Sequence, residues 1–323
     1  MIDITIPRGV ECVHIMIAEA FQKLKTNLEL NDTFNVLIQQ RHNAVRSVIE
    51  NNMGTVNTKL IGSLQRQTRI QPKQGGNFDI DILVILGSFY NWLPSGAPGG
   101  VTPSAAMQTL HGAVNESDRY SAMGPQQDQP TVSFEYKDGT KVEFVPAYID
   151  QIGQSANGIT HSPKGRAYWI PKNGQWVLAD YDHDAAHITT ANDNSDGYLI
   201  PAIKMLKAVK REHFSTMDSF HLELVVAEWI PAIVAWRKKN SMAISYPALI
   251  TDFFKYSKDS LAKQMQVPGS HTPHVALDTI THGAVSKKFD DIKVFCEAIE
   301  AKSDTEKMKS WRILFGEAFP TQV

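Results

Sequence analysis

The sequence predicts an α+β protein in which a mixed sheet flanked by helices, over residues 1–190, packs on an all-α lobe over residues 191–323. Three observations predict this fold class. The chain has 323 residues, enough for two tightly packed lobes. Its strongest strand pattern, FDIDILVIL at residues 78–86, lies in the first lobe. From Asp196 onward, apolar residues recur at helical spacing almost to the end.

Two helices and a short strand are expected at the start of the first lobe. Apolar residues recur at helical spacing over residues 9–30 and again over residues 33–53. The segment 58–61 then predicts a strand, which Gly62 and Ser63 end in a turn. A strand followed by such a turn is a place where phosphate sites are often built.

A hairpin and a series of helices are expected after the central strand. The pattern predicts, in order, a loop rich in Gly and Pro at 93–103, a helix at 104–115 and two hairpin arms at 131–137 and 140–148. Asp138-Gly139 joins the arms and is typical of tight hairpin turns. Residues 161–180 indicate an irregular surface segment. Helices are expected near 197–213, 218–239, 246–265, 281–302 and 304–317.

Composition and charge exclude several classes of protein. A hydrophobic content of 42% and a charged content of 20% are typical of a globular chain. The net charge of -2 argues against a protein that grips long nucleic acid, but it allows small charged substrates. Cys12 and Cys296 have no CxxC partner, so we expect neither a disulfide framework nor a cysteine zinc site. The first residues lack a signal-peptide pattern and no run of eighteen apolar residues follows, so we expect a cytoplasmic protein without a membrane span.

Two carboxylates project together from the central strand. Successive side chains of a strand point to opposite faces, so Asp79 and Asp81 share one face. Like charges side by side are costly without a compensating cation, and oxygen ligands favour Mg²⁺ or Mn²⁺ over zinc. Glu143 lies between Val142 and Phe144 on the second hairpin arm and joins the aspartates if the strands pair. The three acids then bracket two metal ions about 3.5 to 4 Å apart.

The turn before this strand supplies a second part of the expected site. At Gly62 the backbone can approach a ligand closely, while Ser63 and the neighbouring amides can bind phosphate oxygens. A lone DxD on a strand also fits a solvated sheet edge, and a GS pair alone is common. A GS turn, a DxD strand and a third acid in this order form a stronger joint signal.

The sequence around these residues resembles a known family. The runs at 62–86 and 141–148 are similar to the DNA polymerase beta-like nucleotidyltransferase superfamily, and most similar to the CD-NTases, bacterial relatives of cyclic GMP-AMP synthase and oligoadenylate synthase. Those enzymes have a GS turn, a following Thr (here Thr68), a DxD strand and an acid before a VP pair. The family usually has Asp at the position of Glu143, and glutamate also ligates magnesium.

The resemblance continues into the second lobe. The run at 197–211 resembles the family helix whose lysine meets the triphosphate, which implies that role for Lys207. The run at 219–229 resembles the next helix and implies a phosphate contact from Ser219. The resemblance therefore implies a polymerase beta-like nucleotidyltransferase core with N-terminal helices over 1–190, followed by an oligoadenylate-synthase-like helical domain over 191–323.

Several cations accompany Lys207 on its helix. At about 100° per residue, Lys204, Lys207 and Arg211 fall within about 60° of one another and form a stripe. The alternative for this stripe is a solvated helix face. Lys210 falls inside the apolar stripe, where a lysine snorkels or the helix is ending.

The resemblance implies a synthase that joins nucleoside triphosphates into a cyclic di- or trinucleotide. ATP, GTP or a pyrimidine triphosphate would be the substrates, two Mg²⁺ ions (or Mn²⁺) the cofactors, and pyrophosphate the leaving group. Relatives make such second messengers in bacterial antiphage defence, where an effector binds the product. The resemblance also implies a regulatory partner; some such partners of the family engage peptide-like tails, and residues 319–323 are a candidate tail.

Two alternatives stay open at this point. One is a nucleotidyltransferase that modifies an RNA end or a protein, although the chain has no basic excess for RNA. The other is a nucleotide-binding regulator without turnover, which only Glu143 favours.

Other polar and aromatic motifs have simpler interpretations. His183 and His187 would align as metal ligands on a helix, but their neighbours favour a polar loop. No metal site is expected at His271 and His274. The aromatic cluster of Tyr168, Trp169 and Trp176 favours a packed patch over base stacking. The basic run from Arg237 to Lys239 is expected to be a solvated helix end.

Overall fold

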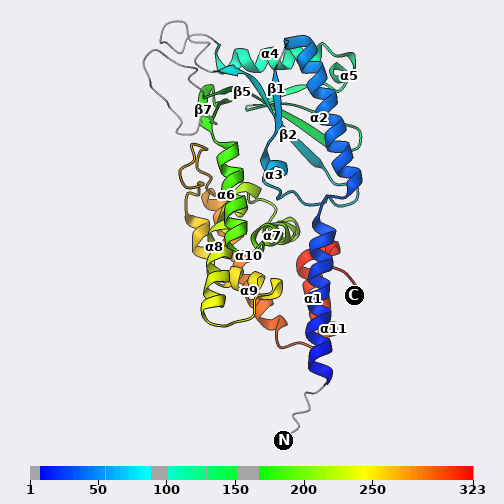
Figure 1. The fold of residues 1–323 in the computed structure, drawn as a ribbon, viewed down its shortest axis with the longest axis vertical. Helices are drawn as coiled ribbons and strands as arrows, with labels where there is room; N and C mark the ends of the chain where they lie inside the picture. The colour runs from blue at the N-terminus through cyan, green and yellow to red at the C-terminus, as the bar shows by residue number, and fades with distance from the viewer. Residues whose placement is uncertain (1–7, 55, 89–100, 129, 151–166, 323) are drawn as a thin grey trace, which may run out of the picture.

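A computed structural model describes residues 8–54, 56–88, 101–128, 130–150 and 167–322, with side chains from residue 16 onward. Figure 1 shows a lobe containing the sheet above a lobe made of helices. Helix α1 (Arg8–Leu28) runs beside the helical lobe, and α2 (Asp32–Met53) continues from it beside the sheet. The α+β arrangement expected from the sequence is confirmed.

One mixed sheet forms the core of the upper lobe. Its strands are β1 (Asn57–Leu60), β2 (Phe78–Ser88), β3 (Gln126–Asp128), β4 (Thr131–Glu135), β5 (Thr140–Ile149), β6 (Tyr168–Lys172) and β7 (Gln175–Ala179). The order is β1-β2-β5-β4-β3, and β6 pairs with the end of β5 and with β7. β2 and β5 run parallel, whereas the other pairs are antiparallel. The predicted hairpin is confirmed, with Gly139 at φ 81 in its turn.

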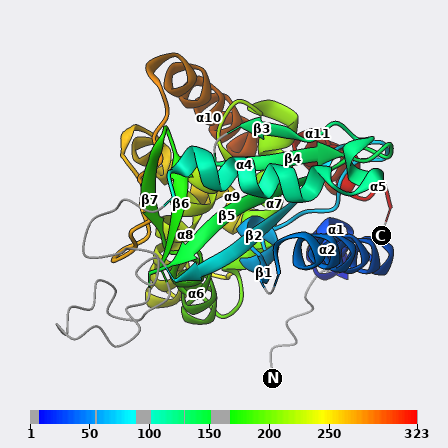
Figure 2. The same ribbon diagram turned by 90° about the horizontal axis from the view of Figure 1, so that it is seen from above.

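Two helices cover one face of the sheet. α2 and α4 (Pro103–Asn115) contribute Val45 and Leu110 to a core that also contains Ile80 and Ile82 of β2. Figure 2 shows α4 lying across the strands. These isoleucines are the residues that alternate with the two aspartates along β2, so burying them directs the aspartates to the opposite face. The expected loop at 93–103 lies mostly outside the described residues.

Three expectations about secondary structure were wrong. A hairpin of β6 and β7 forms where an irregular segment was expected; it turns at Asn173-Gly174, both at positive φ, which is a turn signal of the sequence. The polar loop expected around His183 and His187 is helix α6 (Tyr181–Asn194), whose first turn carries two acids that favour a helix start. α9 (Tyr246–Tyr256) is shorter than predicted and gives way to a 3₁₀ turn at Lys258–Ala262.

The helical lobe surrounds a single apolar core. Its other helices are α7 (Leu199–His213), α8 (Ser219–Lys239), α10 (Thr279–Ile299) and α11 (Asp304–Phe315). By length and composition α8 is apolar enough to cross a membrane, yet Leu222, Val225 and Val226 are fully buried in this core. α8 is therefore a central core helix of this lobe. α6 spans residue 190, and the division of the chain at that residue stays a prediction.

The two ends of the described chain meet in the helical lobe. Phe21 of α1 packs edge-on against Trp311, Phe315 and Phe319, with ring centroids 5.1, 5.6 and 5.4 Å apart. Phe319 is fully buried, and Arg312 donates a hydrogen bond to its carbonyl. Phe319 is therefore part of the core and is not available as a tail, which corrects that expectation for this residue. α1 comes first in the chain but contributes to the core of the second lobe.

Candidate active site

The three predicted acids lie on two paired strands. β2 and β5 are parallel neighbours, and Asp81 stands opposite Glu143 in their register, while Asp79 stands opposite Lys141. Side chains opposite one another in neighbouring strands point to the same face of a sheet. Glu143 was expected to join the aspartates only if its strand pairs with theirs, and the structure contains this pairing.

The charges of these acids act on one another. Partial burial, and then the charges of Glu143 and Asp79, raise the pKa of Asp81 to about 6, although Arg69 and Arg66 work in the opposite direction. A nearby cation would favour the ionised form of such a carboxyl group. The all-oxygen donor set matches the preference of magnesium and manganese. The residues therefore fit a divalent cation.

Basic side chains stand beside two of the acids. Nη1 of Arg69 is 3.6 Å from Oδ2 of Asp79, and Lys141 forms an ion pair with Glu143. Across the described ranges, no three acidic, histidine or cysteine side chains close into a cage for a metal ion. The three acids therefore share one face of the sheet without forming such a cage.

Gly62 fits closely against the acidic strand. Its φ of 67° lies in the left-handed region, and a Cβ atom there would collide with Oδ2 of Asp81. The amide of Ile61 donates to the carbonyl of Asp81 at 3.0 Å, which ties the turn to β2. The turn continues into the single helical turn α3 (Gly62–Gln65). Glycine is therefore required here by both the backbone and the neighbouring carboxylate.

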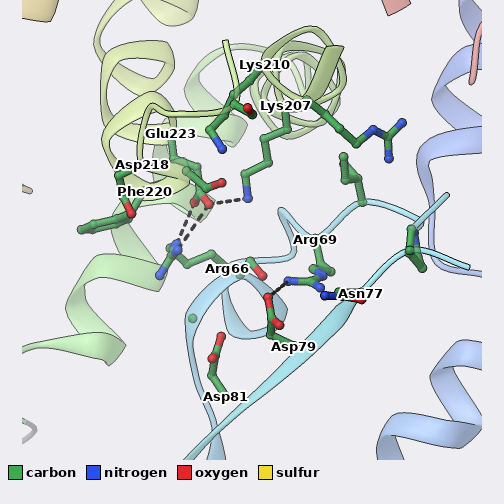
Figure 3. A pocket seen from close by; sticks show the side chains of 18 of the residues that line it. Arg66, Arg69, Asn77, Asp79, Asp81, Lys207, Lys210, Asp218, Phe220 and Glu223 are labelled. Atoms are coloured by element: carbon green, nitrogen blue, oxygen red, sulfur yellow. Dashed lines mark hydrogen bonds and ion pairs between the residues drawn. The ribbon is translucent and has the colours of Figure 1, made fainter. Parts of the chain in front are cut away.

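A cavity of about 590 Å³ opens beside this turn, between the two lobes. The expected site residues that line it are Gly62, Ser63, Asp79, Asp81, Lys207 and Ser219. Glu143 is not among the lining residues and lies beside Asp81 on the next strand. Figure 3 shows the aspartates on β2 below the cavity and the lysines of α7 above it. The structure thus brings six of the seven expected residues to one cavity.

Lys207 belongs to a buried ionic network at the back of the cavity. Its Nζ is 2.5 Å from Oε1 of Glu223 and donates to the carbonyl of Thr68 at 3.0 Å. Nε of Arg66 is 2.7 Å from Oε2 of the same glutamate. Burial opposes the ionisation of Glu223, but the charges of Lys207 and Arg66 outweigh it and lower the pKa of that carboxyl to about 2. The network joins α3 of the upper lobe to α7 and α8 of the lower one (Figure 3).

The expected cationic stripe on α7 is divided. Lys204 pairs with Glu29 at 2.5 Å and does not line the cavity, whereas Lys207 and Arg211 do. Lys210, which helical geometry placed in the apolar stripe, also lines the cavity and is half-buried.

Sequence reasoning missed six charged residues of the cavity: Arg66, Arg69, Lys73, Lys210, Asp218 and Glu223. Both arginines lie in the GSLQRQTR run directly after the turn, which was a usable signal. Glu223 was visible as a lone acid inside the apolar run SFHLELVVAEW. A charge in such a run predicts a buried partner.

The motifs that were set aside have roles within the fold. His183 contacts the carbonyl of Pro268 at 2.9 Å, and His271 contacts Asp180 at 2.8 Å, so both link α6 to the loop before α10. Trp176 donates to the carbonyl of Val101 and packs with Trp169 in one apolar cluster, whereas Tyr168 is buried in another. The three aromatic residues are therefore packed in the fold, but not as a single patch.

The expectation for the basic end of α8 was partly wrong. Nε of Arg237 is 2.6 Å from Oδ2 of Asp252, and Arg237 is largely buried. The side chain therefore ties α8 to α9.

Comparisons with known proteins agree with this geometry. Residues 16–162 match the Second Messenger Oligonucleotide or Dinucleotide Synthetase domain. A "probable cyclic nucleotide synthase" of Bacillus cereus strain VD146 is 23% identical over 186 residues, which are 55% of this chain and 51% of that protein. The chain therefore spans about half the length of this curated relative.

Solved structures of bacterial enzymes have the same fold. CdnC of E. coli MS115-1, in complex with HORMA-deltaN, superposes with a TM-score of 0.68 at 13% identity, covering 95% of this chain and 99% of that one. CdnG of Bradyrhizobium diazoefficiens, a CD-NTase in complex with GTP, superposes with a TM-score of 0.64 at 13% identity, covering 93% and 95%. Residues 16–162 of this chain therefore match the Second Messenger Oligonucleotide or Dinucleotide Synthetase domain, and the chain has the fold of solved CD-NTase structures, in agreement with the resemblance seen in the sequence.

Proposed function

We propose that this protein is a cyclic oligonucleotide synthase that joins nucleoside triphosphates into a cyclic di- or trinucleotide and releases pyrophosphate. One observation carries the proposal: Asp79 and Asp81 line a cavity together with Ser63, and Glu143 lies opposite Asp81 on the same face of the sheet. The matching synthetase domain over residues 16–162 and the name of the B. cereus relative support it.

The site residues have distinct roles in this reaction. Asp79, Asp81 and Glu143 would hold two Mg²⁺ ions, or Mn²⁺. When bound, such ions neutralise the charge that develops on the phosphates and make a sugar hydroxyl a better nucleophile. Ser63 binds the phosphates of the donor nucleotide, and Ser219 contacts them from the start of α8. A bond forms from the attacking hydroxyl oxygen to the α-phosphorus as the bond to pyrophosphate breaks.

Lys207 supports this arrangement from the back of the cavity. Among the residues that the structure describes, its ammonium group contacts Glu223 and Thr68. Its positive charge still faces the same cavity as the aspartates, so it favours an anionic ligand there. We therefore keep Lys207 as a triphosphate-binding residue that acts through its charge.

The cellular role that fits this activity is antiphage signalling in the cytoplasm. The cyclic product would activate a separate effector protein. The complex of the similar E. coli chain with HORMA-deltaN supports a regulatory protein partner for this chain as well. ATP and GTP are the first substrates to test, because CdnC is known with ATP and CdnG in complex with GTP.

Product analysis tests the proposal directly. The purified protein would be incubated with all four ribonucleoside triphosphates and Mg²⁺, and the products treated with phosphatase and analysed by mass spectrometry. We expect a phosphatase-resistant product with the mass of a cyclic di- or trinucleotide, together with released pyrophosphate.

The same experiment separates the two alternatives. Label that is transferred to added RNA or protein, with no small resistant product, would replace cyclisation by transfer to a macromolecule. Nucleotide binding with no metal-dependent pyrophosphate release would identify a regulator without turnover.

A further inference from the structure

One lysine lies among the acids of the candidate site. β5 carries Lys141 two residues before Glu143, so both side chains point to the same face of the sheet. In the register of the strands, Lys141 stands opposite Asp79 of β2 on one side and opposite Glu135 of β4 on the other. Glu143 stands opposite Asp81 of β2. Lys141 is therefore placed between acidic positions of three strands.

The ammonium group of Lys141 contacts one oxygen of Glu143. It donates a hydrogen bond to Oε1 of Glu143, and the two side chains form an ion pair. Among the described residues, no other basic side chain pairs with Glu143, and no hydrogen bond or ion pair reaches its Oε2. Ser133, which stands opposite Glu143 on β4, is uncharged. One oxygen of this carboxylate is therefore held by the protein, and the other is available to a ligand.

Lys141 and Glu143 lie beside the cavity and not in its wall. Asp79 and Asp81 line the cavity, whereas neither Lys141 nor Glu143 is among the lining residues. The ammonium group of Lys141 therefore leaves the space next to the two aspartates free for cations and a nucleotide. A lysine that competed with these cations would have to occupy that space.

A glutamate at position 143 gains more from such a contact than an aspartate would. Its side chain has one more rotatable bond than that of aspartate, so more conformational freedom is lost when its carboxylate binds a cation. The hydrogen bond from Lys141 restricts this freedom before the cation binds. Residues that orient a metal ligand in this way typically contribute about 10–100-fold to metal affinity or activity.

We propose that Lys141 is a positioning residue of the metal site: it fixes the carboxylate of Glu143 through Oε1, so that Oε2 can ligate a divalent cation beside Asp81. The proposal rests on the proposed function, because it assumes that the three acids hold cations. Lys141 acts through Glu143 alone and touches neither the nucleotide nor the reacting atoms.

A double-mutant cycle of Lys141 and Glu143 tests this role. Mn²⁺ would be titrated by calorimetry, with α,β-methylene-ATP present, into the wild type, Lys141→Met, Glu143→Asp and the double variant. We expect Lys141→Met to weaken cation binding about tenfold in the chain with Glu143. In the chain with Glu143→Asp it should change cation binding less than about twofold, because the shorter side chain does not depend on the lysine. Lys141→Arg should restore most of the affinity, because it keeps a donor and a charge.

Lys137→Met is the matched control, because Lys137 is an exposed lysine in the turn of the same hairpin. It should leave cation binding unchanged. Urea unfolding of Lys141→Met should match that of the wild type, because the pair with Glu143 is partly exposed.

Three results would overturn the role of Lys141. They are tighter cation binding by Lys141→Met, which would make the lysine a competitor; equal losses with Glu143 and with Glu143→Asp; and no loss in either chain. A different result would separate this inference from the proposed function. Cation binding that depends on Lys141 through Glu143, in a protein that forms no cyclic product, would contradict the proposed function and support this inference.

Discussion

Two clusters of charge face the same cavity and are built in opposite ways. Glu223 is fully buried and meets two cations, Arg66 and Lys207, at hydrogen-bonding distance. Asp81 is one of three like charges on one face of the sheet, where the nearest cation contact of Asp79 is 3.6 Å long. In the acidic cluster Lys141 pairs with Glu143, but among the described residues no ion pair reaches Asp81. The difference indicates that the first cluster holds the lobes together and that a cation would stabilise the second.

The pKa values of the two carboxyl groups express this difference. That of Glu223 is lowered to about 2 and that of Asp81 is raised to about 6. Burial acts against ionisation in both cases, so the sign is decided by the neighbours: cations around Glu223 and carboxylates around Asp81.

Removal of either aspartate should abolish synthesis. Asp79→Ala and Asp81→Ala each remove a proposed metal ligand, so we expect product formation to fall by at least about a thousandfold. The fold should stay intact, because neither side chain packs in a core. Pyrophosphate release with Mg²⁺ measures the effect, and Asp291→Ala, an exposed acid on α10, is the control. Synthesis at the wild-type rate in either variant would remove the aspartates from the active site.

Truncation of Glu223 should instead lower the stability of the folded protein. Glu223→Ala leaves Arg66 and Lys207 buried without their carboxylate, so we expect a loss of about 3–5 kcal/mol in the free energy of unfolding, measured by urea denaturation. Glu228→Ala on the same helix removes an exposed pair with Lys263 and should cost less than about 1 kcal/mol. Equal stabilities of the two variants would show that the buried network does not hold the lobes together.

The stabilising effect of Glu223 should also depend on pH. Because its pKa is lower in the folded protein, the contribution is fully present above the ordinary value of 4.5. It is lost as the pH falls from there toward about 2.

Neutralising Asp81 should stabilise the metal-free protein. The pKa of Asp81 is raised from 3.8 to about 6, so its ionised form is disfavoured in the fold. The penalty is fully present above about pH 6 and disappears below pH 3.8. With EDTA at pH 7.5, we therefore expect Asp81→Asn to raise the free energy of unfolding by about 1–3 kcal/mol, and the gain to shrink as the pH falls below 6. A loss of stability at pH 7.5 would contradict this electrostatic account.

Shortening Glu143 should have the smallest effect. Glu143 lies beside Asp81 on the neighbouring strand, and Asp at this position retains the carboxylate. We expect Glu143→Asp to keep product formation within about tenfold of the wild type, because the ligand type is unchanged. Glu143→Gln, which removes the charge at constant length, should lower it much further. Equal rates for these two variants would mean that Glu143 does not act as a metal ligand.

The sequence could predict the features that depend on local pattern. Alternation along β2 separated Asp79 and Asp81 from the buried isoleucines, and Asp138-Gly139 specified the hairpin that carries Glu143. These patterns are dictated by the two-residue period of a strand and by the backbone angles of a tight turn.

Features that depend on contacts between the lobes were beyond such reasoning. Glu223 and Arg66 are 157 residues apart in the chain, and no local pattern specifies that they meet. Lys210 was assigned to an apolar stripe because a helical projection gives only the direction of a side chain around the helix axis. It cannot show that a cavity opens beside the last turns of α7, which Lys210 lines. The helical structure around His183 was missed because polar composition outweighed the acids that favour a helix start.

The central claim is that the acidic cluster becomes complete only when divalent cations bind. Calorimetric titration of Mn²⁺ in the presence of α,β-methylene-ATP, on the wild type and on Asp81→Asn, tests it most directly. We expect about two cations per wild-type chain, and strongly weakened binding in the variant. Equal cation binding by the two proteins would contradict the claim.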